Sequence, residues 1–455
     1  MSSSTASALD LRGRTLIARM NNVPFSRWHM KPRVIMGSAT FFDAFDALSL
    51  AFVLPVLKGL WDLSVGQVGL LISIGYIGQF IGALFFGSLA EKIGRVKSAM
   101  FSIGLMSVMA IGCMLSGNYE WLLVCRFIQG IGVGGEVPVA AVYISELSPT
   151  KARGRFFMLY EMIFPIGLMV TGQLGAWLVP SYGWKSMFLV GGVPGIVIAI
   201  LVLFLPESPR WLISRGRHDE AERLIEQLEA STPKRVNPEP EPVDALAAPA
   251  PRADWRELFS RVYRHRTFIV WTLWFCSYLV ANGLNNWLPT LYRTVYNLDL
   301  TVALRTASLT NVMQVVATLA CALLVDHLGR RKWAGFTYAG GAACFIAVAL
   351  LGTDSVVRVA CFATLAYALV GSTNALLYLY TPEIYPTRMR ASATGLATAW
   401  LRLGSSAGPV LVANLVGFGG LPSVFIAFGL ICGVALGVSF FMIETRGRKL
   451  EEIAP

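Results

Sequence analysis

The chain has 455 residues, of which 55% are hydrophobic and only 14% are charged. A soluble domain usually carries charge on about one quarter of its residues. The apolar residues form about a dozen runs, most of which approach the roughly 20 residues that span a bilayer as a helix. This composition excludes a water-soluble enzyme, a secreted disulfide scaffold and a disordered chain, and it predicts an integral multi-pass membrane protein.

The net charge of +11 is explained by topology. With twelve spans and a cytoplasmic N-terminus, 31 of the 38 Lys and Arg residues fall on one side of the membrane and 5 on the other. Cytoplasmic segments carry such an excess, so we expect both termini in the cytoplasm. The basic balance then indicates contact with anionic membrane lipid and no nucleic-acid partner. The cysteines all fall within predicted spans, without metal-ligand spacing, so we expect no metal site.

In chain order, the sequence predicts two helical bundles joined by a long polar loop. The central loop is expected to hold amphipathic helices over 212–230 and 254–266, with a Pro-rich linker between them. The expected segments are a cytoplasmic N-terminal tail (1–33), a six-helix bundle (34–205), the cytoplasmic central loop (206–266), a second six-helix bundle (267–443) and a cytoplasmic tail (444–455).

Two loop motifs occur twice. EKIGRVK (91–97) returns as DHLGRRK (326–332), and ELSPTKAR (146–153) returns as EIYPTRMR (383–390). The order is the same and the offset is nearly constant, which indicates two homologous six-helix halves. Parallel repeats of this kind place the substrate site between the halves, near the middle of the membrane.

These repeated loops resemble the major facilitator superfamily. The resemblance implies an all-α membrane fold of 12 transmembrane helices in two pseudo-symmetric six-helix bundles. PESPRWL (206–212) and ETRGRKLEE (444–452) resemble sugar-porter loop signatures. RFIQGIGVGGEVPVAAVYISELSP (126–149) resembles the niacin-permease and synaptic-vesicle-glycoprotein relatives, and FFDAFDALSLAFVLP (41–55) resembles the D-x-x-D of aromatic-acid:proton symporters.

Charged residues of the loop motifs are candidates for a cytoplasmic gate. Orientation of the chain by positive charge explains part of the pattern. Resemblance to the superfamily implies, in addition, a breakable charge network that locks the two halves together when the protein faces outward. The gate candidates are Glu91, Arg95, Arg126, Glu146, Arg153, Asp326, Arg330, Glu383 and Arg390.

Three acids inside predicted spans are candidates for proton coupling. Asp43 and Asp46 share one face of the first span, and two neighbouring carboxylates in apolar surroundings favour a proton on one of them. A static pair satisfied by donors at the helix end is the alternative. Glu136 is followed by Pro138, which frees a backbone carbonyl. Glu136 is therefore either protonated and bonded to that carbonyl, or a second proton site or substrate contact.

Arg402, in AWLRLGSSAGP (399–409), is an arginine inside the eleventh span. An unpaired guanidinium there is costly and cannot lose its proton, so it needs a carboxylate from the protein or from the substrate. Its context resembles the helix-11 arginine of organic-anion transporters, which implies an anionic substrate. A purely structural salt bridge is the alternative.

Polar and aromatic residues of the second half are candidates to line the substrate cavity. Asn282, Asn285 and Asn286 form a polar stripe on one helix face, in place of the paired glutamines typical of sugar porters. Such amides either line a cavity or hold helices together. The further candidates are Trp287, which could stack on a flat ring, and Gln314, Asn374 and Tyr378.

Together these features predict a secondary active transporter of the bacterial inner membrane, working as a monomer and needing no cofactor beyond protons. The expected activity is import of a small organic anion with protons by alternating access, with nicotinate or a hydroxybenzoate as the substrate. A sugar or polyol:proton symporter, a proton antiporter and a non-transporting membrane receptor are the alternatives. A membrane enzyme is not expected, because the sequence shows no catalytic constellation.

Overall fold

The structure is a computed structural model that describes residues 3–24, 26–147, 162–232, 255–386 and 389–446. The regular elements in these ranges are all helices, and eleven of them are long and apolar enough to cross a membrane. The last, α15 (Arg390–Ser439), contains two crossings, because a positive φ of 69° at Gly420 bends the chain inside it. Counting both parts of α15, the described helices provide the twelve expected crossings.

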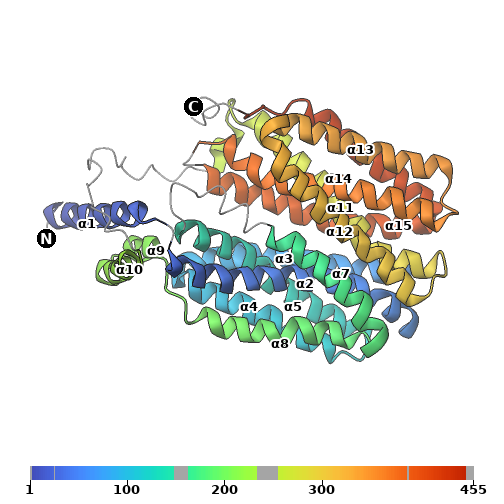
Figure 1. Cartoon of the computed structure of the whole chain (residues 1–455), viewed down its shortest axis with the longest axis horizontal. Helices are drawn as coiled ribbons and strands as arrows, with labels where there is room; N and C mark the ends of the chain where they lie inside the picture. The colour runs from blue at the N-terminus through green and yellow to red at the C-terminus, as the bar shows by residue number, and fades with distance from the viewer. Residues whose placement is uncertain (1–2, 25, 148–161, 233–254, 387–388, 447–455) are drawn as a thin grey trace.

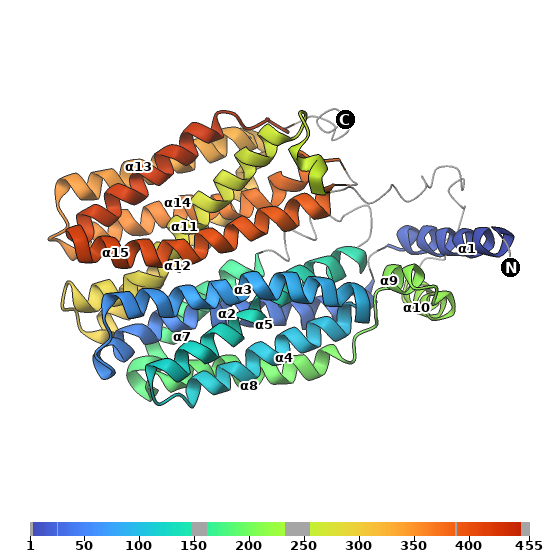
Figure 2. The same cartoon turned by 180° about the vertical axis from the view of Figure 1, so that it is seen from behind.

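The crossings form two six-helix bundles that lie side by side, as the blue-to-green and yellow-to-red ribbons in Figures 1 and 2 show. The first bundle consists of α2 (Met30–Leu60), α3 (Val65–Ile93), α4 (Arg95–Met114), α5 (Tyr119–Leu147), α7 (Ile163–Tyr182) and α8 (Lys185–Val202). The second consists of α11 (Arg264–Thr294), α12 (Leu300–Leu328), α13 (Arg330–Leu351), α14 (Val356–Glu383) and the two parts of α15.

Corresponding helices of the two bundles have the same start and stop signals. The side chain of Ser64 accepts a hydrogen bond from the backbone of Gln67 at the start of α3, and Asp299 caps α12 in a similar way. Both helices end at a glycine with positive φ, Gly94 at 105° and Gly329 at 92°. Since these glycines belong to the repeated loops, we call their end of the molecule the motif end.

The glycine-rich run of α5 brings that helix into close contact with α3. A Cβ atom on Gly134 would collide with the backbone of Gln79, and one on Gly82 would collide with the backbone of Ile131. Only glycine allows the two backbones to approach this closely. The packing fixes the rotation of α5 about its own axis, and Glu136, next to these glycines, is buried inside the first half against Thr40 of α2.

Several of the described contacts between the two bundles lie toward the end opposite the motif end. Ser73 Oγ on α3 donates to the backbone oxygen of Ser406 on α15 at 2.7 Å. Gln173 Nε2 on α7 donates to Ser308 Oγ on α12 at 3.3 Å. A Cβ on Gly69 would lie 2.7 Å from that of Ala413. The halves are therefore packed tightly at this end.

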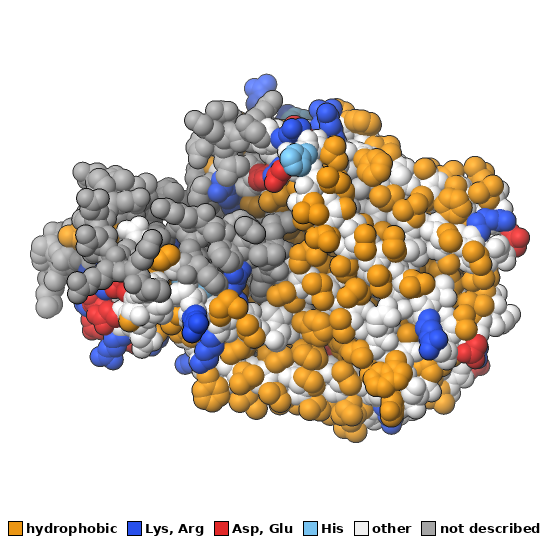
Figure 3. Space-filling model, viewed as in Figure 1, with side chains coloured by type: hydrophobic (Ala, Val, Ile, Leu, Met, Phe, Trp, Pro, Cys, Tyr) orange, Lys and Arg blue, Asp and Glu red, His pale blue; other side chains and the backbone are white. Residues whose placement is uncertain are grey.

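The outer surface of the bundles is mainly apolar. Figure 3 shows hydrophobic side chains over most of the face, with charged side chains gathered at its two ends. Large apolar residues such as Phe418, Leu323 and Leu84 are 93%, 66% and 60% exposed. Lipid tails are the solvent that such a surface requires, so the chain is an integral multi-pass membrane protein.

A small helical cap lies beyond the motif end, where Figures 1 and 2 show three helices together. It consists of α1 (Ser3–Asn22), α9 (Pro209–Ser214) and α10 (His218–Ala230). The sequence predicted one helix over 212–230, but Gly216, with φ 73°, separates α9 from α10. Residues 1–33 were expected only as a polar tail, and most of them are helical.

The cap is held together by a small apolar core with ion pairs around it. Leu16 and Met20 of α1 pack with Ile225 and Leu228 of α10, and all four are buried. Around them, Arg12 Nη2 lies 2.7 Å from Asp219 Oδ1, and other pairs flank the same contact. Exposed ion pairs stabilise little, so the apolar contact carries most of the docking energy.

The two other predictions for the central loop fall partly outside the described residues. The Pro-rich linker is described only up to residue 232. The amphipathic segment expected at 254–266 is a short 3-10 helix, η4 (Trp255–Phe259), followed by the start of α11.

We expect Ile225→Ala to weaken the docking of α1 on α10. The side chain is fully buried, and such truncations cost about 2–5 kcal/mol. Hydrogen exchange of the α1 amides in the purified protein should accelerate at least about tenfold. Gln227→Ala, on the exposed face of the same helix, is the matched control. Unchanged exchange in Ile225→Ala would contradict this account of the cap.

Candidate functional site

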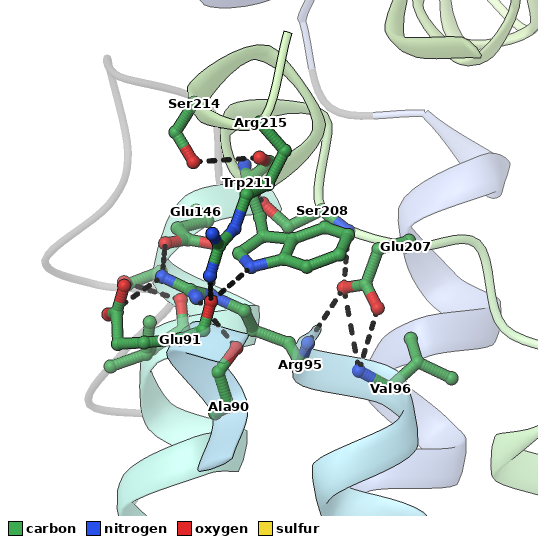
Figure 4. A network of polar contacts seen from close by, with 12 residues as sticks. Ala90, Glu91, Arg95, Val96, Glu146, Glu207, Ser208, Trp211, Ser214 and Arg215 are labelled. Atoms are coloured by element: carbon green, nitrogen blue, oxygen red, sulfur yellow. Dashed lines mark hydrogen bonds and ion pairs between the residues drawn. The ribbon is translucent and has the colours of Figure 1, made fainter. Parts of the chain in front are cut away.

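The first motif loop is a network of ion pairs and hydrogen bonds, drawn in Figure 4. Arg95 Nη2 lies 3.0 Å from Glu146 Oε1 on α5 and 3.3 Å from Glu91 Oε1 on α3. Trp211 Nε1 of α9 donates to the backbone oxygen of Glu91 at 3.0 Å. The network therefore ties the ends of α3, α4 and α5 to the helical cap.

Glu207, from the PESPRWL signature, caps the N-terminus of α4. Its carboxylate accepts hydrogen bonds from the backbone nitrogens of Arg95 at 3.0 Å and Val96 at 3.2 Å, as Figure 4 shows. The free backbone N–H groups of a helix start attract negative charge. Burial raises the pKa of Glu207, and these backbone hydrogen bonds partly offset that effect.

The second motif loop repeats this arrangement in the other half. Arg330 lies 3.0 Å from Glu383 and 2.7 Å from Asp326. Glu444, from the ETRGRKLEE signature, accepts from the backbone nitrogens of Arg330 at 2.9 Å and Arg331 at 3.1 Å. Sequence reasoning missed Glu207 and Glu444 as partners of the loops. The sequence position of the two signatures could have identified these residues, because each signature follows the last helix of its half.

The gate candidates therefore separate into two groups, one in each half. The described ion pairs of Arg95 and of Arg330 stay within their own half. Arg390 Nε donates to the backbone oxygen of Tyr385 at 3.1 Å, and Arg153 lies outside the described residues.

Arg126 does not belong to the motif-end networks. It lies near the start of α5, whereas Glu146 lies near the end, about 30 Å further along the same helix. Its Nη1 donates to Gln129 Oε1 at 2.7 Å and to the backbone oxygen of Asp46 at 3.4 Å. The prediction grouped Arg126 with the motif-end residues because it did not take into account the direction in which this helix crosses the membrane; the structure places Arg126 away from them.

A cavity of about 130 Å³ lies between the two halves. Helices α2, α3, α5 and α7 form its wall on one side, and α11, α12, α14 and α15 form the other. Eight of the predicted residues line it: Asp43, Asn282, Asn285, Asn286, Gln314, Asn374, Tyr378 and Arg402. They come from five helices, so only the tertiary structure brings them together.

Arg402 is the positive charge of the cavity. Its side chain is 6% exposed, and it reaches across to the other half, where Nη2 donates to the backbone oxygen of Gly134 at 3.2 Å. Nη1 donates to the backbone oxygen of Thr398 at 3.2 Å, and Nε has no hydrogen-bond partner. Among the described residues, no carboxylate lies within ion-pair distance of Arg402. The structural salt bridge considered from the sequence is therefore absent from this part of the chain.

Asp43 is the acidic side chain that lines the cavity. It is 2% exposed, and its Oδ1 has no hydrogen-bond partner. Glu136 and Arg402 both act electrostatically on its carboxyl group. Glu136 is fully buried behind the cavity wall, where its Oε1 accepts from Thr40 Oγ1 at 3.0 Å. Asp43 is thus the one of these two acids that faces the cavity.

Asp46 points away from the cavity although it lies on the same helix. Its carboxyl group packs against Gly191 of α8 and lies beside Arg126 and Gln129. Neither carboxyl oxygen has a hydrogen-bond partner by distance and angle. Asp46 and Arg126 thus lie near each other inside the first half, where Arg126 acts electrostatically on the Asp46 carboxyl group and bonds the backbone oxygen of the same residue.

Two tyrosines lie beside Arg402 in the cavity. Tyr278 and Tyr378 both act electrostatically on its guanidinium. Trp274 stacks on Tyr278 with ring centroids 5.6 Å apart, and it meets Tyr378 edge-on at 4.6 Å. Sequence reasoning missed Tyr278. Its position could have identified it, because Tyr278 lies one helical turn before Asn282 and therefore on the same face of α11.

The amides of α11 form the opposite part of the cavity, near the tight contact between the halves. Tyr76 Oη donates to Asn282 Oδ1 at 3.1 Å and accepts from Asn286 Nδ2 at 3.1 Å. Trp287, predicted here as a stacking residue, does not line the cavity. It is 2% exposed, and its Nε1 donates to the backbone oxygen of Pro409 at 3.1 Å, which joins α11 to α15.

A cavity that is enclosed by two homologous membrane bundles and lined by charged and amide side chains defines a membrane transporter. The match to known families agrees. Residues 34–455 match the model of the sugar (and other) transporter family, and the chain belongs to that family within the major facilitator superfamily. It is accordingly a transporter and not an enzyme.

The chain is similar to several transporters of aromatic acids. It is 33% identical to the niacin transporter NiaP of Acinetobacter baylyi, over 96% of this chain and 99% of that protein. It is 30% identical to the gallate transporter of Pseudomonas putida, over 90% and 91%. It is 28% identical to the 4-hydroxybenzoate transporter PcaK of Acinetobacter baylyi, over 93% of each.

The fold is similar to that of the xylose transporter XylE from E. coli. Its partially occluded inward-open structure matches with a TM-score of 0.74 at 18% identity, over 93% of this chain and 100% of that chain. At this identity the match concerns the fold, and it confirms the predicted arrangement of two bundles.

We expect Gly94→Ala to destabilise the motif end by about 1–3 kcal/mol. The residue has φ 105°, which strains an L-residue, and its Cβ would collide with the Glu207 carboxylate. Thermal unfolding of the detergent-solubilised protein measures the loss. Gly87→Ala in α3, whose Cβ meets no atom within 4 Å, is the control and should be neutral or stabilising. Equal melting temperatures for the two variants would contradict the role assigned to this turn.

Proposed function

We propose that this protein is a proton-coupled symporter that imports a small aromatic monocarboxylate, such as nicotinate or a hydroxybenzoate, across the bacterial inner membrane by alternating access. One observation carries the proposal. Arg402 is buried in the central cavity without a carboxylate partner among the described residues. A guanidinium in apolar surroundings needs a negative partner, and a carboxylate on the substrate supplies one.

Arg402 and its neighbours suit an aromatic ring attached to that carboxylate. Tyr278 and Tyr378 line the cavity together with Arg402, and Trp274 packs against both tyrosines. The amides at the far part of the cavity can bind a ring nitrogen or a ring hydroxyl group. The names of the niacin, gallate and 4-hydroxybenzoate relatives support this class of substrate.

In this proposal the motif end faces the cytoplasm, as the distribution of Lys and Arg predicts. An inward-facing state is then supported by the described contacts of Ser73 and Gln173, which join the halves toward the other end. Since the ion pairs of Arg95 and Arg330 stay within their own halves here, contacts between the two networks would form only when the halves close on the cytoplasmic side. One chain supplies the whole cavity, which supports function as a monomer.

Asp43 is our candidate for the coupling proton. It lines the same cavity as Arg402 but comes from the opposite half. A proton bound to Asp43 and a substrate bound to Arg402 would therefore both alter the net charge of this cavity. Asp46 faces Arg126 instead, and the pair is a second candidate for proton exchange within the first half. Glu136 contributes through Asp43, on which it acts electrostatically.

A sugar or polyol:proton symporter is the second candidate. The amides Asn282, Asn285, Asn286 and Gln314 around the cavity favour it, because sugar hydroxyls bind such groups. A neutral sugar offers Arg402 no carboxylate to bind, which favours the aromatic acid as substrate.

We expect Arg402→Ala to weaken binding of nicotinate and 4-hydroxybenzoate at least about 30-fold, since removing one partner of a buried charge pair costs about 2–5 kcal/mol. Titration calorimetry of the purified protein measures this. Arg402→Lys should recover part of the affinity because it keeps the charge and loses the bidentate geometry. Arg305→Ala, an exposed arginine of α12, is the control. Unchanged anion binding in Arg402→Ala, or binding of glucose alone by the wild type, would contradict the proposal.

A further inference from the structure

We propose that Cys113 and Cys125 form a redox site, in which a peroxide converts two buried thiols into a disulfide and thereby slows transport. The site goes beyond the proposed function and takes from it only the orientation of the chain. Neither cysteine lines the central cavity. The site follows from the way two helix ends bring these thiols together and from the amide that one of them contacts.

The two thiols meet between neighbouring helices of the first half. Cys113 lies at the end of α4 and Cys125 near the start of α5, and their exposed fractions are 0% and 3%. A side-chain hydrogen bond joins the two thiol groups. Since α4 begins at the motif end, these cysteines lie toward the opposite end. In the orientation proposed above, that end faces the periplasm, where disulfides form and persist.

The backbones of α4 and α5 approach each other here as closely as a disulfide requires. A Cβ atom on Gly112, the residue before Cys113, would lie 3.9 Å from the Cβ atom of Cys125. Bridged cysteines have Cβ atoms about 3.5–4.5 Å apart. Trp121 Nε1 on α5 donates to the backbone oxygen of Gly112 at 3.3 Å, and this bond holds the two helix ends together. Bridging therefore needs little movement of the backbone.

The hydrogen bonds of this pair make it different from isolated buried cysteines. Cys113 Sγ donates to Gln129 Oε1 at 3.6 Å, and it also contacts the thiol of Cys125. A hydrogen bond to a thiolate stabilises it, and the thiolate is the form that reacts with oxidants. Cys113 can supply that bond to Cys125, the more exposed of the two. The geometry therefore assigns the first reaction to Cys125 and leaves Cys113 to close the bridge.

Hydrogen peroxide is the oxidant in this proposal, because its size is close to that of water and the thiols are barely exposed. The sulfur of Cys125 attacks one peroxide oxygen, the O–O bond breaks, and a sulfenic acid forms while the thiol proton leaves in a water molecule. The sulfur of Cys113 then attacks the sulfenic sulfur. The S–S bond forms, and the hydroxyl group leaves with the Cys113 proton as a second water. Each sulfur loses one electron, and the two peroxide oxygens gain them.

Closing the disulfide changes what holds Arg126. The Cys113 sulfur loses its hydrogen and with it the bond to Gln129, whose side chain is fully buried and whose Nε2 has no hydrogen-bond partner. Gln129 accepts the shorter of the two hydrogen bonds described for Arg126, at 2.7 Å, and the backbone oxygen of Asp46 accepts the longer, at 3.4 Å. Gln129 is thus a positioning residue. Arg126 joins α5 to α2, and both helices form walls of the central cavity, so we expect a looser Gln129 to slow transport.

The first test measures the disulfide in the purified wild-type protein. Hydrogen peroxide is added in small molar excess, the protein is unfolded, remaining thiols are alkylated, and the digest is analysed by mass spectrometry. We expect a cross-linked peptide pair with Cys113 and Cys125 that disappears with dithiothreitol. Cys344 and Cys432, buried thiols of α13 and α15, are the matched controls and should remain alkylated. Absence of the cross-link, or equal oxidation of the control thiols, would overturn the proposal.

A second test measures the effect on transport in liposomes. Peroxide should lower the initial uptake of labelled 4-hydroxybenzoate at least about threefold, a change within the worth of one hydrogen bond. Dithiothreitol should restore the rate, whereas methionine sulfoxide needs an enzyme for its reduction. Cys125→Ser should transport like the reduced wild type and should not respond to peroxide. Cys113→Ser, which keeps a donor for Gln129, should behave in the same way.

Cys361→Ser, which removes an exposed thiol of α14, is the control and should keep the peroxide response. A response that persists in both Cys125→Ser and Cys113→Ser would overturn the proposal. If the cross-link forms but the reduced protein does not carry 4-hydroxybenzoate, the proposed function fails and the redox site stands. If 4-hydroxybenzoate is carried and peroxide leaves the thiols or the rate unchanged, the proposed function stands and the redox switch fails.

Discussion

The cost of a charge in apolar surroundings is the constraint on which the rest of this structure depends. A buried guanidinium or carboxylate must have a partner, a proton or access to water. Asp46 has Arg126 within its own half, but Asp43 and Arg402 stand in opposite halves and line one cavity. The electrostatic energy of these two side chains therefore depends on what occupies the cavity and on the relative position of the two halves. In the proposed symport, this dependence is what would couple the proton to the substrate.

The same physical chemistry acts at the motif end, in contact with water. Two turns with positive φ, at Gly94 and Gly329, bring an acidic side chain from the end of each half onto a helix start. The resulting networks hold each bundle as a unit. Exposed and half-buried ion pairs of this kind are weak enough to exchange partners. A transporter whose halves move as rigid bodies needs rigidity within each half and only breakable contacts between them.

Fold and substrate are set at different places in this molecule. The xylose transporter shares the arrangement of helices, whereas the relatives of highest identity among those described here have names that refer to aromatic acids. The shared fold follows from helix starts, glycine contacts and turns. In the proposed function, substrate class follows from a few side chains on the inner helix faces, of which Arg402, Tyr278 and Tyr378 carry the argument. Function is therefore argued from the site and not from the fold.

The sequence by itself determined the class of protein, the number of crossings, the two homologous halves and eight residues of the cavity, because hydropathy, repeats and intramembrane charges are local properties of the chain. The tertiary structure decided which charges meet. It placed Asp46 with Arg126 and not in the cavity, and it placed Trp287 against Pro409 in the packing. It also showed that Glu207 and Glu444 cap helices and that α1 docks on α10. Helical spacing tells which residues share a face, but the neighbour of that face depends on contacts between helices far apart in the chain.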